Sequence, residues 1–300
     1  MDAETLKDYE KACQIAAEAL QYGRRLIVKG SDLLDVTEKT EQFILVQKKA
    51  GLAFPVQLSL NSTAAHYYPD HDEKTLLTDQ VIKIDVGVHI NGYIGDNALT
   101  VDLSGQYGEL VKASQEALKN AIAVVKDRVM IGDIGTAIQE TITGYGFSPV
   151  RNLSGHGLEK YDIHAPPSIP NTATGDSTTL SEGQVIAIEP FASTGAGMIM
   201  ETSNANLFQL NHEKPVRDPT TQEILRFIRQ YEGFPFAKRW LVAKYPLFKV
   251  NLALKNMLNQ DILKEYTPLV DKAKGIVSQA EHTMLVEKDR ARVLTVAQDL

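Results

Sequence analysis

Several features are scarce in this chain of 300 residues, and each scarcity removes a class of protein. A single cysteine, Cys13, excludes an internal disulfide and a zinc site built from cysteines. No apolar run approaches the roughly 18 residues that cross a bilayer, and the first residues lack the basic start and apolar stretch of a secretory signal. We therefore expect a cytoplasmic protein without a membrane partner.

Positive charge is also in short supply, because 31 Lys and Arg stand against 38 Asp and Glu, for a net charge of −7. No run of basic residues is long enough to form a basic arm. This balance gives no global attraction for nucleic acid, so we expect no direct nucleic-acid binding. The 43% hydrophobic content is enough for a substantial core in one large domain or two ordinary ones.

Helical periodicity dominates the start of the chain. Apolar residues at spacings of three, four and seven from Leu6 to Ile27 predict a long amphipathic helix ended by Gly30. A second helix is expected after Ser31, with a stop at Gly51. Further helical patterns, each closed by a glycine, occur at about 108–130 and 133–145.

The second half of the chain mixes short β-like runs with one helical block. Residues 205–270 have helix-like stretches broken by prolines and indicate an inserted helical subdomain. The segment 276–296 returns to β character, so we expect it to rejoin the sheet that precedes the insertion. The chain is thus interpreted as α+β, with a main domain formed by 1–204 and 271–300.

The strongest local signal is a hairpin in residues 81–101, where apolar residues alternate before the pair Asn91-Gly92. A two-residue turn at this pair makes the numbers of paired residues sum to 183. Parity then places Asp85 and Asp96 on one face, as diagonal neighbours about 7 Å apart at Cα. Two carboxylates on an otherwise buried ribbon repel each other, and a cation is the natural compensation. The alternative is that one aspartate caps a turn and the other is solvated.

Three more side chains interrupt segments that otherwise resemble buried strands. His156 stands between two glycines, Glu189 follows the apolar run VIAI, and Glu281 opens EHTMLV. Each alone has an ordinary alternative: a structural histidine, or an acid at a surface or strand edge. Together with the two aspartates, the set of four carboxylates and one imidazole suits Mn, Fe, Co or Zn in a binuclear site.

Other routes to catalysis have little support in the sequence. The one cysteine lies in the first predicted helix, and neither a Gly-x-Ser-x-Gly elbow nor a phosphate-cradling glycine loop is present. A binuclear site activates a water and polarises a carbonyl, while a nearby carboxylate carries the proton to the departing amine. This chemistry is amide hydrolysis without a protein nucleophile.

At these segments the chain resembles the methionine aminopeptidases, over nearly its entire length. KIDVGVHINGYIGDNALTV resembles the family's strand pair with two metal-binding aspartates, GHGLEKYDIHAPPSIP its metal-binding histidine followed eight residues later by a substrate-binding one, and EHTMLV its final strand. The resemblance implies the pita-bread fold of the creatinase-like enzymes, a curved antiparallel sheet flanked by helices. It also implies two divalent metal ions held by Asp85, Asp96, His156, Glu189 and Glu281, with Glu281 preferred to Glu287.

The resemblance further assigns roles around the metals. It implies that His66 contacts the scissile region or leaving side of the substrate and that His164 stabilises the tetrahedral intermediate. Glu189 would also act as the proton shuttle. The apolar pocket for the methionine side chain is expected at Phe54, Ile163 and Tyr266. The ordinary alternative is loop hydrogen bonding for the two histidines and core packing for Phe54.

The gap of 91 residues between Glu189 and Glu281 resembles the type II members, and the start directly at the core resembles their archaeal form. The resemblance implies a monomeric enzyme that removes the initiator methionine from nascent chains with a small second residue, with the ribosome as an expected partner. A proline-directed relative, such as a prolidase or aminopeptidase P, uses a similar ligand set but usually carries a large extra N-terminal domain. A non-catalytic binding homologue would have lost ligands and gained basic tails.

Overall fold

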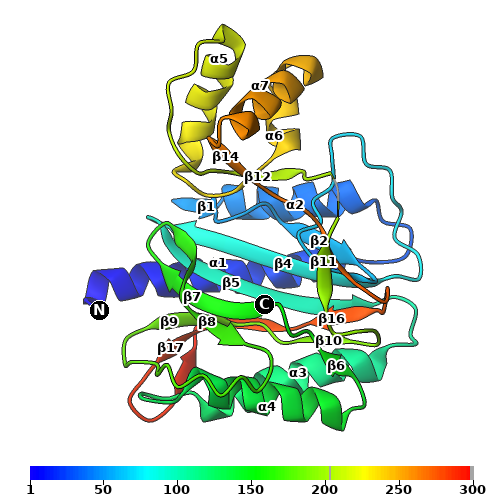
Figure 1. Ribbon diagram of the computed structural model, residues 1–300, viewed down its shortest axis with the longest axis vertical. Coiled ribbons are helices and arrows are strands. Elements are labelled where there is room, and N and C mark those ends of the chain that lie inside the picture. Colours follow the sequence, from blue (N-terminus) through cyan, green and yellow to red (C-terminus); the bar gives the residue numbers. More distant parts are fainter. Residues whose placement is uncertain (203, 298–300) are drawn as a thin grey trace.

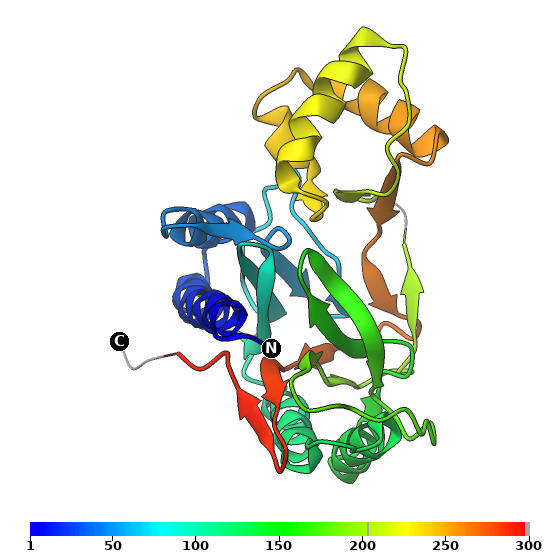
Figure 2. The same ribbon diagram turned by 90° about the vertical axis from the view of Figure 1, so that its left-hand side faces the viewer.

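The computed structural model describes residues 1–202 and 204–297. A curved antiparallel sheet forms its centre, helices cover one side of the sheet, and a smaller subdomain stands above it (Figure 1). A view from the side shows the helices on the convex outside of the curve (Figure 2). The helices are α1 (Ala3–Leu26), α2 (Leu33–Leu45), α3 (Gly108–Val124), α4 (Ile131–Gly144), α5 (Pro219–Ile228), α6 (Lys238–Val242) and α7 (Leu247–Asn259).

The main sheet has nine strands. They are β1 (Ala50–Leu52), β2 (Gln57–Leu60), β4 (Val81–Ile90), β5 (Tyr93–Asp102), β7 (Ser154–Glu159), β8 (Asp162–Pro170), β9 (Val185–Ile188), β17 (Glu281–Val286) and β18 (Ala291–Val293). Their order is β1-β4-β5-β17-β9-β7-β8, with β2 beside β4 and β18 beside β17. The late strand β17 therefore enters the centre of the sheet, which confirms that the segment after the insertion rejoins it.

Two three-stranded sheets complete the main body. One joins β11 (Ile199–Glu201), β15 (Leu269–Asp271) and β3 (Thr63–Ala65), and the other joins β16 (Val277–Gln279), β10 (Phe191–Ser193) and β6 (Ser148–Pro149). Both place β strands from the two ends of the insertion beside earlier parts of the chain. The α+β class predicted from the sequence is confirmed.

The predicted hairpin is present in the predicted register. Ile90 pairs with Tyr93, Asp85 with Ala98, and Gly87 with Asp96. The turn residues Asn91 and Gly92 have φ angles of 52° and 87°, the left-handed conformation that a tight two-residue turn requires. The apolar residues of β4 with even numbers point to α1 and α2, so the two aspartates face the other side.

The first helix packs directly on this hairpin. Small residues of α1 are fully buried against it, and a Cβ at Gly95 of β5 would lie 2.5 Å from the Cα of Cys13. Gly95 is therefore required for the close approach of helix and sheet. α3 and α4 cover the lower part of the sheet (Figure 1). Within the described residues, no helix is long and apolar enough to cross a membrane.

The ends of the first two helices differ from the prediction. α1 ends at Leu26 instead of continuing to Gly30, because Ile27 leaves the helix with ψ of 88° and buries its side chain among core residues. α2 ends at Leu45 instead of Gly51, because residues 50–52 form β1 and pair with the end of β4. Periodicity located both helices, but strand pairing across the fold decided where they stop.

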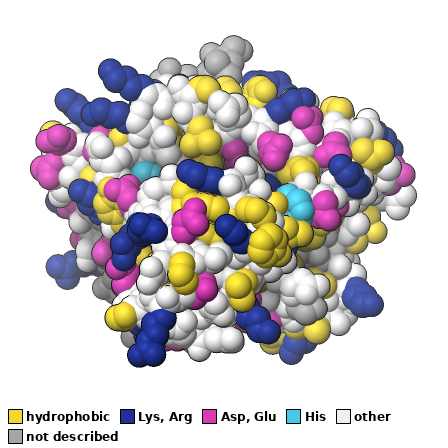
Figure 3. Space-filling view, turned by 90° about the horizontal axis from the view of Figure 1, so that it is seen from above, with side chains coloured by type: hydrophobic (Ala, Val, Ile, Leu, Met, Phe, Trp, Pro, Cys, Tyr) yellow, Lys and Arg dark blue, Asp and Glu magenta, His cyan; other side chains and the backbone are white. Residues whose placement is uncertain are grey.

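The region predicted as a helical subdomain contains strands as well. Its helices α5, α6 and α7 pack around a shared apolar core that includes Ile224, Leu254 and Met257. Beneath them lies a sheet in the order β13 (Phe236–Ala237), β12 (Leu207–Leu210), β14 (Leu263–Tyr266). Seen from above, apolar side chains are interspersed with both basic and acidic ones (Figure 3). The limits 205–270 stay a prediction.

The strands of the subdomain were missed for a local reason. The stretch KVNLALKNMLNQDILKEY is helix-like in sequence up to Tyr266, but α7 ends at Asn259 and Asp261 turns the chain with φ of 55°. The four residues of β14 then pair with β12, Leu263 with Leu210 and Tyr266 with Leu207. Strands of two to four residues carry too little periodicity to be separated from a helix end.

The subdomain is anchored to the main body through charged side chains. Arg239 of α6 donates to the carboxylate of Glu41 in α2, and the Trp240 indole donates to the same carboxylate at 3.1 Å. Both ionic groups are buried, with exposed fractions of 4% and 5%. Lys238 forms an ion pair with Asp70 at 2.7 Å. These contacts fix one wall of the cavity described below, because that wall belongs to the subdomain.

Asp271, at the end of β15, ties two loops together. Its carboxylate accepts hydrogen bonds from the backbone N–H groups of Ala196, Gly197, Ala273 and Gly275 and from the Ser193 hydroxyl. Burial opposes ionisation of this group, but the hydrogen bonds outweigh it and lower the pKa below the usual 3.8. The ionised carboxylate is thus part of the fold.

We expect Asp271→Asn to destabilise the protein by about 2–3 kcal/mol at pH 7, because the amide presents donors to backbone donors and loses the charge. Since the folded pKa lies below the unfolded one, this stabilisation is present above about pH 4 and is lost as the pH falls through the folded value. Urea unfolding at pH 7 and pH 3 measures it. Exposed Asp289→Asn is the control, and equal effects of the two variants would contradict the account.

Candidate metal centre and substrate pocket

One cavity of about 310 Å³ lies between the curved sheet and the subdomain. It contains all ten residues predicted for the site, although they are spread over more than 200 positions of the chain. Its walls are Phe54, Gln57, Ala65, His66, Tyr68, Asp85, Asp96, Asn152, Leu153, Ser154, His156, Ile163, His164, Glu189, Phe191, Leu207, Pro235, Lys264, Tyr266 and Glu281.

The five expected metal ligands come from five neighbouring strands. In sheet order, β4 carries Asp85, β5 Asp96, β17 Glu281 and β7 His156, while Glu189 directly follows β9. The small residue Ala98 pairs with both Asp85 and Glu281, so it leaves space between their carboxylates. A single concave face of the sheet thus gathers all five side chains.

These side chains are buried and close together. The side-chain ligand atoms of Asp96, His156 and Glu281 all lie within 4.8 Å of one another. The His156 Nε2 atom lies 3.9 Å from Asp96 Oδ2 and 3.9 Å from Glu189 Oε1. Gln279 Nε2 donates to Asp85 Oδ2 at 3.2 Å and to Glu189 Oε2 at 3.3 Å, and so connects the remaining two acids. The geometry fits a cluster of ligands better than separate ion pairs.

The four carboxylates gathered at the base of the cavity are stable in ionised form only if cations compensate their charge. Burial raises the pKa of Asp96, Glu189 and Glu281 well above the usual values, and repulsion among the carboxylates raises it further. Burial also raises the pKa of Asp85, to about 6. Among the described residues, Asp85 Oδ1, Asp96 Oδ1 and Glu281 Oε2 are buried without a hydrogen-bond donor. Hard oxygen donors left free in this way fit divalent metal ions.

His156 is suited to the same role. Burial lowers its pKa to about 3, so the imidazole is neutral at physiological pH and keeps a lone pair for a metal. Its Nδ1 atom lies 3.2 Å from the carbonyl oxygen of Gly157, which leaves Nε2 directed at the acids. A Cβ at either neighbouring glycine would lie 2.2–2.3 Å from a backbone oxygen of the adjoining strands, so the glycines are needed for this packing.

Two further histidines, His66 and His164, line the same cavity. The His164 ring lies 4.9 Å from the ring of His156, and the His66 ring lies 5.5 Å from that of Tyr266. Burial lowers the pKa of His66 to about 4, and enclosure in the cavity lowers the pKa of His164. Both are neutral at pH 7 and can donate or accept a hydrogen bond.

Apolar residues form the side of the cavity. Phe54 and Ile163 are buried, with exposed fractions of 7% and 3%, and Tyr266 enters from the subdomain. A Cβ at Gly87 would lie 2.3 Å from the Phe54 ring, so this glycine leaves the space that the ring occupies. The three expected wall residues therefore line the cavity, and their contact with a methionine side chain stays a prediction.

Two glutamines were missed by sequence reasoning. The Gln57 side chain donates to Asp85 and accepts from the backbone N–H of His66 at 2.6 Å, while Gln279 joins Asp85 to Glu189. Both side chains are buried. A glutamine inside the apolar runs PVQLSL and IVSQAE was the available signal, because a buried amide needs hydrogen-bond partners.

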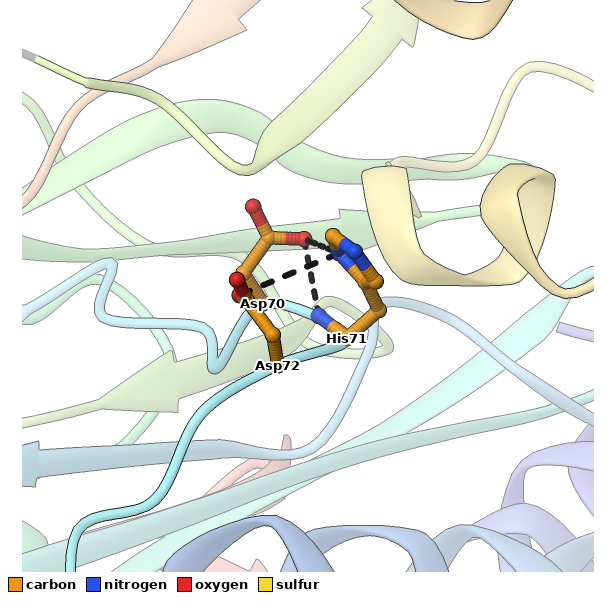
Figure 4. A group of neighbouring side chains, drawn as sticks. All are labelled: Asp70, His71 and Asp72. Atoms are coloured by element: carbon orange, nitrogen blue, oxygen red, sulfur yellow. Dashed lines mark hydrogen bonds and ion pairs between the residues drawn. The ribbon is translucent and has the colours of Figure 1, made fainter. Parts of the chain in front are cut away.

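A second group of potential ligands lies outside the cavity. Asp70, His71 and Asp72 are consecutive in one loop, and the His71 Nδ1 atom lies 2.8 Å from Asp70 and 3.9 Å from Asp72 (Figure 4). Asp70 is already paired with Lys238, and Asp72 is largely exposed. This loop therefore serves to hold the subdomain and is a poor candidate for a catalytic metal.

The gathered ligands and the curved sheet are those of a metallopeptidase, and the chain belongs to metallopeptidase family M24, whose match covers residues 7–218. The chain is 43% identical to the methionine aminopeptidase of Archaeoglobus fulgidus over 297 residues, which cover 98% of this chain and 100% of that protein. It is 37% identical to the methionine aminopeptidase of Methanocaldococcus jannaschii over 295 residues, covering 97% and 99% of the two chains.

Solved structures share the fold at lower identity. The methionine aminopeptidase of Thermotoga maritima superposes with a TM-score of 0.72 at 23% identity, covering 98% of each chain. A thermophilic Arx1 gives 0.84 at 17% identity over 100% of this chain and 93% of the other. The prolidase of Pyrococcus furiosus gives 0.62 at 19% identity, over 99% of this chain and 65% of the other. The expectation of a pita-bread fold is confirmed.

Proposed function

We propose that this protein is a methionine aminopeptidase that removes the initiator methionine from new chains with a small second residue. The observation that carries the proposal is the 43% identity to an archaeal methionine aminopeptidase over the full length of both chains. The cavity supports it, because all of the expected site residues line it. A proline-directed activity has less support, since the prolidase matches only the fold and only 65% of its chain is covered.

Asp85, Asp96, His156, Glu189 and Glu281 would hold the metal. We propose two divalent ions, of Co, Mn, Fe or Zn, because five ligands with four carboxylates exceed what one such ion needs. Ions held by these residues would supply an activated water and would polarise the carbonyl of the first peptide bond. This use of metal is consistent with the family, M24 being a family of metallopeptidases.

The remaining roles, which are proton transfer, stabilisation of the developing charge and binding of the methionine side chain, are assigned to other atoms of the chain. Glu189 would carry the proton to the departing amine, and burial and the nearby charge of Asp85, which raise the pKa of its carboxyl group, favour such a role. The neutral rings of His66 and His164 line the same cavity as the acids and would donate to the substrate's carbonyl oxygen as charge develops there. Phe54, Ile163 and Tyr266 offer an apolar wall for the methionine side chain.

Partner and place are part of the same proposal. The substrate would be the N-terminus of a nascent polypeptide, which brings the enzyme to the ribosome. We propose a monomer as the active form, as the resemblance to the methionine aminopeptidases implies. The single, buried, free Cys13 is consistent with a reducing cytoplasm.

A peptide assay tests this function. The protein is stripped of metal with a chelator, and Co, Mn, Fe or Zn is added back before incubation with Met-Ala-Ser or with Ala-Pro-Ser. We expect methionine release from the first peptide with at least one metal, and little cleavage of the second. Preferential cleavage of Ala-Pro-Ser would support the proline-directed alternative, and no methionine release with any metal would overturn the proposal.

Metal addition should also stabilise the folded protein. A ligand at 100 times its dissociation constant that binds only the folded state adds about 2.7 kcal/mol. We therefore expect thermal unfolding of the stripped protein to shift upward on metal addition and to return with chelator. His71→Ala is the control, because it removes the imidazole of the loop in Figure 4. Loss of the shift in this variant would show that the metal binds at the loop of Asp70, His71 and Asp72, and would contradict binding in the cavity.

A further inference from the structure

Lys264 is the one Lys or Arg among the residues that line the cavity. It lies on β14, where Gln209 of β12 pairs with Lys264 and Leu207 pairs with Tyr266. Alternation along the strand places Lys264 and Tyr266 on the same face, turned to the cavity. The opposite face carries Leu263 and Phe208 into the core of the subdomain.

Lys264 lies at the solvent-exposed opening of the cavity, and the candidate metal-binding acids lie at its buried base. Lys264 and Asn152 are exposed, whereas Asp85, Asp96 and Glu281 have exposed fractions of 2–5%. The Lys264 Nζ atom lies 4.4 Å from the centre of the Tyr266 ring. Among the described residues, no carboxylate forms an ion pair with it. The positive charge at the mouth is therefore available to a ligand.

The positive charge of Lys264 also acts on two histidines of the cavity. Burial is the main cause of the lowered pKa of His66, and a positive charge on His164 or on Lys264 lowers it further. The pKa of His164 is lowered by its enclosure and then by Lys264. Lys264 thus lines the same cavity as these two rings and is near enough to act on both.

We propose that Lys264 determines specificity beyond the second residue, by favouring peptides with a carboxylate at residue three or four. The inference rests on the proposed function, because an aminopeptidase binds the chain terminus at the floor and the rest of the peptide must leave through the mouth. In an extended peptide, residues three and four lie about 5–9 Å past the first peptide bond. A carboxylate at either of these peptide positions comes near the Lys264 ammonium group and is attracted to it. A lysine side chain at the same position is repelled by it.

The expected size of the preference for acidic peptides follows from the solvent exposure of Lys264. An exposed ion pair contributes up to about 1 kcal/mol, which corresponds to a ratio of about fivefold between matched substrates. Screening should reduce the ratio as salt is raised, because the pair is open to solvent. The alternative is that Lys264 only supports the Tyr266 ring, in which case its removal changes the turnover of all peptides alike.

Four amidated tetrapeptides distinguish recognition of an acidic substrate residue by Lys264 from mere support of the Tyr266 ring. Met-Ala-Asp-Ser is compared with Met-Ala-Asn-Ser, and Met-Ala-Ser-Asp with Met-Ala-Ser-Asn, so that each pair differs only by one charge. The metal-loaded enzyme, Lys264→Met, Lys264→Arg and Lys264→Glu are assayed for kcat and KM. Lys255→Met, an exposed change on α7 outside the cavity, controls for the loss of one positive charge from the protein.

We expect the unchanged enzyme to prefer the aspartate peptide of at least one pair by about two- to fivefold in kcat/KM, mainly through KM. Lys264→Arg and Lys255→Met should keep this ratio, Lys264→Met should bring it to about one, and Lys264→Glu should invert it. A ratio that is one in the unchanged enzyme, or is retained by Lys264→Met, overturns the proposal. Cleavage of the asparagine peptides reports the aminopeptidase activity itself, so its loss would be a separate failure.

Discussion

Replacing Asp96 by asparagine should remove nearly all peptidase activity and leave the fold intact. The change keeps the shape of the side chain but removes one charge from the ligand cluster of β5, β7 and β17. Residues that only support a metal ligand contribute about 10- to 100-fold to activity, so loss of the ligand itself should cost more than about 100-fold. The assay is methionine release from Met-Ala-Ser with saturating metal.

The unfolding temperature distinguishes a metal-ligand role of Asp96 from a structural role. Burial raises the pKa of Asp96, and repulsion from Asp85 and Glu189 adds to it, so the carboxylate is a cost to the metal-free fold. Asp96→Asn should therefore unfold at the same temperature as the unchanged metal-free protein, or higher. The exposed Asp79, paired with Lys29, supplies the control Asp79→Asn, which should keep its activity. Near-normal turnover of Asp96→Asn, or its unfolding, would contradict the ligand assignment.

Arg239→Met should have the largest effect on stability. The guanidinium and its partner Glu41 are 4% and 5% exposed, and Glu41 also accepts from the Trp240 indole and the Val56 N–H. Removing the arginine leaves a buried carboxylate without its cation, which costs about 3–5 kcal/mol. Denaturant unfolding measures the loss. Because this pair joins the subdomain to α2, KM for the peptide should rise as the wall formed by Tyr266 loosens.

A second substitution tests the cause. In the double variant Glu41→Gln with Arg239→Met, the buried charge is gone and an acceptor is kept for its two N–H donors, so the double variant should be more stable than Arg239→Met alone. Arg229→Met removes an exposed pair, 2.9 Å from Glu213, and should cost no more than about 1 kcal/mol. Equal losses for Arg229→Met and Arg239→Met would show that burial is not the cause.

The sequence could predict the site where the chemistry is local. Asn91-Gly92 fixes the register of one hairpin, and this register alone places Asp85 and Asp96 on one face. Glu281 is different, because it joins them only when β17 enters the sheet between β5 and β9. That pairing spans most of the chain, so its position came from the family resemblance.

The parts that escaped prediction depend on distant contacts. Gln279 acts on Asp85 across 194 residues, and Arg239 meets Glu41 across 198. No periodicity in the sequence links such partners. The strand β14 was hidden behind a helical pattern, although it carries Tyr266, which was predicted for the pocket from resemblance. Local pattern therefore found most elements, while tertiary pairing decided their ends and the supports of the site.

Anomalous scattering from crystals grown with manganese or cobalt is the most direct test that this cavity is a metal centre. We predict strong peaks at the floor of the cavity, about 2.0–2.3 Å from carboxylate oxygens of Asp85, Asp96 and Glu281 and from the Nε2 atom of His156. Crystals of Asp96→Asn should lose peak height there. Peaks at Asp70, His71 and Asp72 alone, or no peak near these acids at saturating metal, would contradict the account.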